Sequence, residues 1–154
     1  MLRPILTATL LAGTLDILSA FFFAGLSGIG VLPVLRYVAS GPFGDAVLES
    51  GGWSWPIVGL GVHFAIMAVM VAAYMIVARR LPALLRHPFV AGIFYGFLLW
   101  IVMYWIVKPL RWPDAPLPGT LWGISNALFS HCILVGIPIA WVATRHFRNR
   151  PSID

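Results

Sequence analysis

Residues 55–78 read WPIVGLGVHFAIMAVMVAAYMIVA, a stretch that contains no Asp, Glu, Lys or Arg. About 20 consecutive apolar residues in a helix are enough to cross the hydrocarbon core of a bilayer. Arg79 and Arg80 follow directly, where a membrane-crossing helix would meet the lipid headgroups. The stretch therefore predicts a transmembrane helix over about residues 55–78.

Three further apolar runs lie outward from this one, over about residues 4–26, 88–107 and 119–144. Of the 154 residues, 60% are hydrophobic and 10% are charged, whereas a water-soluble domain carries about 25% charged residues. We therefore predict an all-α integral membrane protein. Residues 1–154 are expected to form a single domain, an antiparallel bundle of four transmembrane helices.

Basic residues are divided unequally between the two sides that this topology creates. The side holding both termini has seven Lys and Arg, and the opposite side has three. The positive-inside rule therefore places both termini in the cytoplasm. The net charge of +5 comes from these flanking residues, so it does not indicate nucleic-acid binding. The terminal side holds Arg3, Arg79, Arg80, Arg86, Arg145, Arg148 and Arg150, and the other side holds Arg36, Lys108 and Arg111.

The connection over residues 27–54 is the only long one. Its segment 33–39 is apolar apart from Arg36, which predicts a short interfacial helix in the first outer loop. Arg36 could pair there with Asp45 or Glu49, a contact worth little if it is exposed.

Two local patterns inside the apolar runs affect helix packing. Pro138 is expected to bend the last helix, because proline removes a backbone donor. Gly92 and Gly96 have the spacing that lets two membrane helices approach closely. This spacing fits packing within the bundle, and it also fits a dimer face.

A polar layer is predicted across the helices. At about 1.5 Å of rise per residue, Asp16, His63 and His131 lie at similar heights, about 20 to 24 Å from the basic residues at the cytoplasmic ends. A charged Asp in hydrocarbon costs about 2.5–3.5 kcal/mol, so Asp16 is expected to face inward and to be either neutral or paired. A histidine is its expected partner, because either ring nitrogen can donate to the carboxylate. Further polar or aromatic residues at or near this height are Trp100, Tyr104 and Asn126.

Three interpretations of this layer remain open. As a site that binds or conducts a small ligand or protons, it would open outward through Asn126 and Tyr104. As a cofactor site, His63 and His131 could ligate haem, or join Asp16 around a metal ion, in a redox or enzyme subunit. As interhelical hydrogen bonds, the layer would be structural, in an assembly partner of a membrane complex.

No catalytic motif was found in the sequence, so we expect a non-enzymatic membrane protein of the first kind. Besides the bilayer and a small-molecule ligand, the expected partners are a second copy of the chain or a larger membrane complex, and no nucleic acid. A haem or metal cofactor is the alternative.

Short motifs along nearly the whole chain carry a resemblance to a known family. The chain resembles the YagU-like family of small four-helix bacterial inner-membrane proteins. The resemblance implies a bacterial inner-membrane location and adds no activity. It rests on Leu15-Asp16, LRYVASG over residues 35–41, Gly44, Gly59-Leu60, His63-Phe64, Tyr95-Gly96, Pro109-Leu110, His131 and VGIPIA over residues 135–140.

Overall fold

The computed structural model describes residues 2–117 and 119–148, and all regular secondary structure in this part of the chain is helical. Four helical stretches are long and apolar enough to cross a membrane. This confirms the predicted all-α class with four long apolar helices. The stretches are Leu2–Leu26, Ser54–Arg80, Pro88–Arg111 and Leu121–Arg148.

The first two long stretches are single helices, α1 (Leu2–Leu26) and α3 (Ser54–Arg80). The third and fourth each contain a π-helical segment between two α-helical parts. The third consists of α5 (Pro88–Ile101), η2 (Val102–Val107) and α6 (Lys108–Arg111). The fourth consists of α7 (Leu121–Leu128), η3 (Phe129–Gly136) and α8 (Ile137–Arg148).

Shorter helices fill the first two connections. The long connection holds α2 (Val31–Phe43) and a 3-10 turn, η1 (Asp45–Val47), so a helix lies where the sequence predicted one. A single turn, α4 (Ala83–Arg86), joins α3 to α5.

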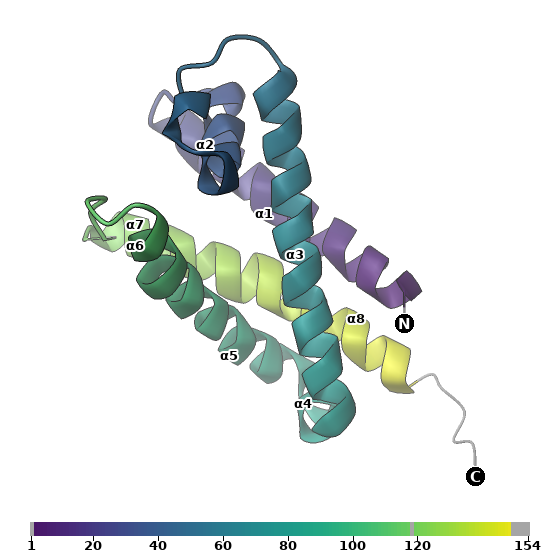
Figure 1. The fold of residues 1–154 in the computed structure, drawn as a ribbon. Helices are drawn as coiled ribbons and strands as arrows, with labels where there is room; N and C mark the ends of the chain where they lie inside the picture. Colours follow the sequence, from purple (N-terminus) through teal and green to yellow (C-terminus); the bar gives the residue numbers. More distant parts are fainter. Residues whose placement is uncertain (1, 118, 149–154) are drawn as a thin grey trace.

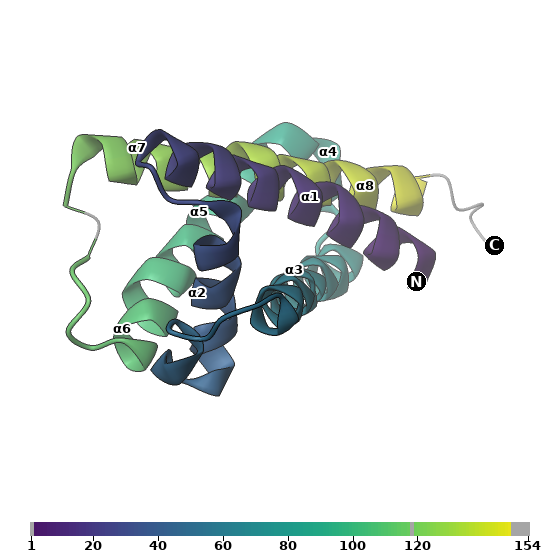
Figure 2. The same cartoon turned by 90° about the horizontal axis from the view of Figure 1, so that it is seen from above.

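The long helices do not all contact one another equally. α1 packs against α3, η3 and α8, and α5 packs against η3 and α8. α3 and α5 leave α4 in diverging directions (Figure 1), and α2 lies between their far ends (Figure 2). Buried side chains near the α4 end form the core, which includes Ala8, Ala12, Met67, Val71, Tyr74, Met75, Leu99, Val135, Ile139 and Ala143.

Glycines hold α5 close to the fourth stretch. A Cβ atom on Gly92 would lie 2.6 Å from the Cα of Ile137, and one on Gly96 would overlap the carbonyl group of His131. Gly136 faces α5 in the same way, since its Cβ would overlap the backbone of Gly92. The Gly92–Gly96 spacing therefore serves packing within the chain.

A similar contact joins α2 to α3. A Cβ atom on Gly59 would overlap the carbonyl of Leu35, so the two backbones touch at this point. The fold thus contains two close helix pairs, α2 with α3 and α5 with η3.

Both π-helical segments end two residues before a proline. η2 ends before Pro109 and η3 before Pro138. In η3 the N–H of Ile137 donates to the carbonyl of Cys132, five residues earlier rather than four. Because proline lacks an N–H and its ring crowds the preceding turn, a wider turn fits there. The irregularity expected at Pro138 is therefore a π-helical segment.

Gly96→Ala is expected to destabilise the fold, because its new Cβ would push α5 away from η3. Overpacking of this kind costs about 1–3 kcal/mol. Gly61→Ala is the matched control, since a Cβ at Gly61 meets no atom within 4 Å and alanine favours the helix. Thermal melts in detergent should place Gly96→Ala below the unmodified protein and Gly61→Ala at or above it. Equal melting of both variants would contradict the close contact.

Candidate functional site

A cavity of about 310 Å³ lies between α3 and the third helical stretch, with α1, α2 and η3 also contributing to its wall. Its volume is at the lower end of the range for small-molecule sites. Most of the wall is apolar and rich in methionine. The lining residues are Asp16, Tyr37, Val38, His63, Ile66, Met67, Met70, Met103, Tyr104, Val107, Lys108, Trp112, His131 and Val135.

The three ionisable residues singled out in the sequence line this one cavity. Asp16 comes from α1, His63 from α3 and His131 from η3. His63 is buried, and Asp16 and His131 are half-buried. Helix rotation, which the sequence did not give, turns all three side chains toward the same space.

Each histidine is anchored to a backbone carbonyl. Nε2 of His63 donates to the carbonyl of Gly13 over 2.9 Å, and Nδ1 of His131 donates to the carbonyl of Ala127 over 2.9 Å. Because a carbonyl oxygen only accepts, these bonds place a proton on Nε2 of His63 and on Nδ1 of His131. In a neutral ring the other nitrogen of each histidine is then an acceptor.

The expected direct pairing of Asp16 with a histidine is not found. Within residues 2–117 and 119–148, Asp16 forms no hydrogen bond or ion pair with His63 or His131. The imidazoles find their partners in the backbone instead. The carboxyl group of Asp16 therefore lines the cavity without a bonded partner among the described side chains.

Of the other predicted residues, only Tyr104 lines the cavity. Its ring, on η2, meets that of His131 edge to face, with centroids 5.9 Å apart. Trp100 lies behind it, 6.2 Å from the Tyr104 ring, and does not line the cavity. Asn126, on α7, does not line it either. An outward opening through Asn126 is therefore not observed.

A buried hydrogen bond fixes η3 beside the cavity. The hydroxyl groups of Ser19 on α1 and Ser130 on η3 are 2.9 Å apart. Ser130 directly precedes His131, so this bond and the Gly96 contact hold the segment that carries the histidine from two sides.

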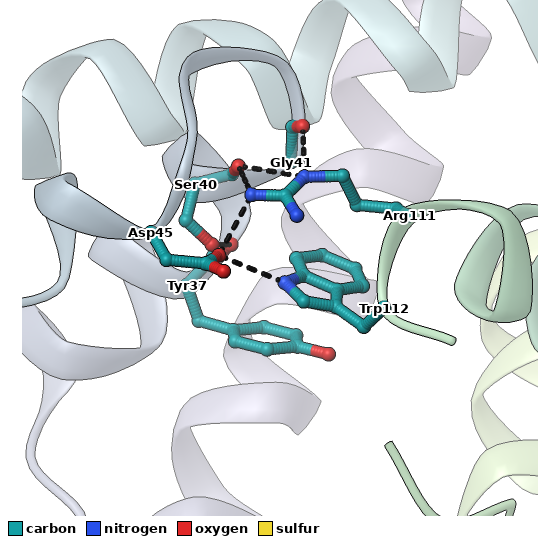
Figure 3. Close-up of polar contacts among 6 residues, drawn as sticks. All are labelled: Tyr37, Ser40, Gly41, Asp45, Arg111 and Trp112. Carbon is teal, nitrogen blue, oxygen red and sulfur yellow. Dashed lines mark hydrogen bonds and ion pairs between the residues drawn. The ribbon is translucent and has the colours of Figure 1, made fainter. Parts of the chain in front are cut away.

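Two stacked rings form the end of the cavity near α2. Tyr37 on α2 and Trp112, directly after α6, stack with centroids 4.7 Å apart and planes within 13° (Figure 3). Burial raises the pKa of the Tyr37 phenol, an effect that the Arg111 guanidinium opposes. The phenol therefore stays neutral at ordinary pH.

Arg111 ties α6 to the end of α2. Its guanidinium donates to the carbonyls of Ser40 and Gly41 over 2.8 and 2.7 Å, and to the carboxylate of Asp45 over 2.7 Å (Figure 3). The indole N–H of Trp112 donates to the same carboxylate over 3.1 Å. We call this group of bonds the Arg111 clamp. It joins the end of the third helical stretch to the end of α2, beside the cavity.

The clamp corrects one expectation from the sequence. The sequence allowed a pair between Arg36 and Asp45 or Glu49, but Asp45 pairs with Arg111, and Arg36 donates to the carbonyl of Gly52 over 3.1 Å. Arg111 is 66 residues from Asp45 in the chain. Only the packing of α6 beside α2 brings them together.

Several lining residues were not singled out in the sequence. They are Tyr37, Lys108 and Trp112, together with the methionines Met67, Met70 and Met103. One sequence feature could have indicated this end of the cavity. Asp45 and Arg111 have opposite charges, and both lie on the side predicted to be opposite the termini. Lys108 is held at the edge of the cavity by a 2.7 Å bond to the carbonyl of Pro116.

The described side chains at this cavity are not arranged to hold a metal ion. Among the described residues, no three His, Cys, Asp or Glu side chains are grouped so that they could hold a metal ion. The set Asp16, His63 and His131 therefore lines a cavity without forming a ligand cage.

Comparison of the chain with family models, curated proteins and solved structures found no match. The chemistry of the site must therefore be argued from its own groups. The carboxyl oxygens of Asp16, Nδ1 of His63 and Nε2 of His131 are acceptors that the described side chains leave unbonded. An acceptor-rich patch in an apolar cavity favours a small molecule with N–H or O–H donors.

Arg111→Met is expected to destabilise the fold, because it removes bonds to three acceptors on and after α2. The clamp is partly exposed, with side-chain exposures of 27% for Arg111 and 59% for Asp45, so we expect a loss of about 1–2 kcal/mol. Arg86→Met on α4 is the control. Thermal melts that place both variants together would show that the clamp contributes nothing.

Proposed function

We propose that this chain is a non-enzymatic protein of a bacterial inner membrane, in the YagU-like group, whose cavity binds or conducts a small ligand. The observation that carries the proposal is the convergence of Asp16, His63 and His131 on one cavity from three long apolar helical stretches. An ionisable residue in a membrane helix faces the protein interior or a cavity and commonly marks a ligand or proton pathway.

The outward faces of the helices support insertion in a membrane. Large apolar side chains on all four stretches are strongly exposed, among them Leu10 at 60%, Val69 at 70%, Phe94 at 71% and Leu121 at 83%. A water-soluble monomer rarely exposes large apolar side chains along all of its long helices. The stretches have 24 to 28 residues, or about 36–42 Å of helix, which exceeds the hydrocarbon thickness of about 30 Å.

The bonding around the cavity favours a binding site over a purely structural polar layer. A structural layer would use its ionisable groups to bond one helix to another. Here one side-chain bond of this kind, from His63 to Gly13, joins α3 to α1, and His131 bonds within its own helical stretch. Asp16 is left facing the cavity. A ligand that donates to Asp16 would complete its hydrogen bonding.

The proposed orientation places both termini in the cytoplasm, and the Arg111 clamp on the outer side. A reporter fused after Arg150 should show a cytoplasmic location, and one inserted near Glu49 should show a periplasmic location, since the basic residues favour that arrangement. The measurement is the activity of paired reporters that are active on opposite sides of the membrane. The reverse pattern would overturn the orientation, and cytosolic activity at both sites would overturn membrane insertion.

Ligand binding can be tested with short-chain alkylamines, alcohols and carboxylates as probes in thermal-shift measurements on purified protein. Amines and alcohols are expected to raise the melting temperature, because they can donate to Asp16, and carboxylates are not. Asp16→Asn should reduce the shift by amines. Ile66→Trp should abolish both shifts, because the larger side chain fills the cavity that Ile66 lines.

Val69→Trp is the matched control for this experiment. Val69 is on the same helix as Ile66, is 70% exposed, and does not line the cavity. It should retain the full shifts. Equal shifts in all variants would mean that the probes bind elsewhere, and the absence of any shift would favour the structural interpretation of the polar layer.

A further inference from the structure

A second hollow lies at the opposite end of α1 from the Arg111 clamp, between the beginning of α1 and the end of α8. Its volume is about 520 Å³, and Arg3, Thr7, Trp141 and Arg145 are among its lining residues. Figure 2 shows that α1 and α8 run alongside each other toward this end. This hollow, called the groove below, shares no lining residue with the cavity that Asp16, His63 and His131 line, which is called the polar cavity below.

The charges in this groove are of one sign. Arg3 comes from α1 and Arg145 from α8, and no acidic residue lines the groove in the part of the chain that the structure describes. Within the same part, neither arginine has an ion pair with a carboxylate. Two guanidinium groups therefore face one hollow without a described acidic partner, an arrangement that favours an anion.

An aromatic ring positions one of the two cations. The guanidinium carbon of Arg145 lies 4.6 Å from the centre of the Trp141 ring. A cation–π contact of this kind uses the face of the ring and makes no demand on hydrogen-bond acceptors. It restrains Arg145 over the groove while its N–H groups stay available to oxygen ligands.

The surface next to the groove is suited to an acyl chain. Arg3, Thr7 and Leu10 follow one another at helical spacing along one face of α1, and Leu10 is 60% exposed. A molecule with its anionic group between the arginines could therefore lay an apolar chain along α1. A free inorganic anion has no apolar part that could pack against this surface.

We propose that this groove binds the headgroup phosphate of an anionic phospholipid, between Arg3 and Arg145. This proposal rests on the membrane insertion argued above and is independent of any ligand in the polar cavity. It agrees with the proposed orientation, because the groove would then face the cytoplasmic leaflet, whose anionic lipids attract basic residues near the surface.

The test compares phosphatidylglycerol with phosphatidylcholine as probes, added to detergent-purified protein and followed by native mass spectrometry and thermal shift. Phosphatidylglycerol should bind preferentially and raise the melting temperature. The double variant Arg3→Gln/Arg145→Gln should bind phosphatidylglycerol at least about tenfold more weakly, because it lacks the two guanidinium groups that would donate to the phosphate. Arg79→Gln/Arg80→Gln is the matched control, because it removes two charges at the end of α3 that do not line the groove.

Each outcome supports or overturns the proposal. A selective loss in the groove variant supports it, and an equal loss in both double variants overturns it in favour of diffuse electrostatic attraction. Glycerol phosphate competing as well as the lipid would show that a soluble anion is the ligand, which also overturns it. If the groove variant melts low without lipid, Arg145→Gln is compared with Arg145→Lys, and binding must follow the charge.

Failure of this proposal can be told apart from failure of the proposed function. The reporter fusions test membrane insertion, and the amine and alcohol shifts test the polar cavity. Both measurements are made on protein that retains Arg3 and Arg145, and neither uses an anionic lipid as a probe.

Discussion

The close contact between α5 and η3 is the constraint on which the rest of the structure depends. Gly92 and Gly96 present no side chain to Gly136, Ile137 and the backbone of His131, so the two helices touch through their backbones. This contact holds α5 to the fourth helical stretch. α3 makes its own close contact with α2 at Gly59. Two tight pairs thus leave a space between them, and the polar cavity occupies that space.

The same contact explains why His131 lines the cavity. It lies in a π-helical segment, held on one side by α5 and on another by the hydrogen bond between Ser19 and Ser130. π-helical turns are often found at functional sites. His131 lines the cavity from within η3, and Tyr104, in the similar segment η2, meets its ring.

The way in which the ionisable groups are bonded distinguishes the possible roles of the polar layer. Histidines that paired with Asp16 would have satisfied the carboxyl group and closed the space between the helices. Instead, each imidazole is satisfied on one nitrogen by a carbonyl, and Asp16 is left to the cavity. The carboxyl oxygens of Asp16 can still accept hydrogen bonds from a molecule in the cavity. This open acceptor is the physical reason for proposing that a ligand, rather than another side chain, completes the site.

The sequence by itself determined the class of the structure and the identity of its central polar residues. Long runs with little charge predict helices long enough to cross a membrane, and Asp16 and the two histidines were conspicuous because ionisable residues are rare in such runs. Pro138 predicted a bend in the last helix, and the structure has a π-helical segment just before this proline. The tertiary structure alone decided which side of each helix faces inward. When a helix is apolar all round, its sequence carries no amphipathic signal that fixes its rotation. For this reason the methionines on the cavity wall and the exclusion of Trp100 and Asn126 from it could not be predicted. The Arg111 clamp depends on the packing of α6 beside α2.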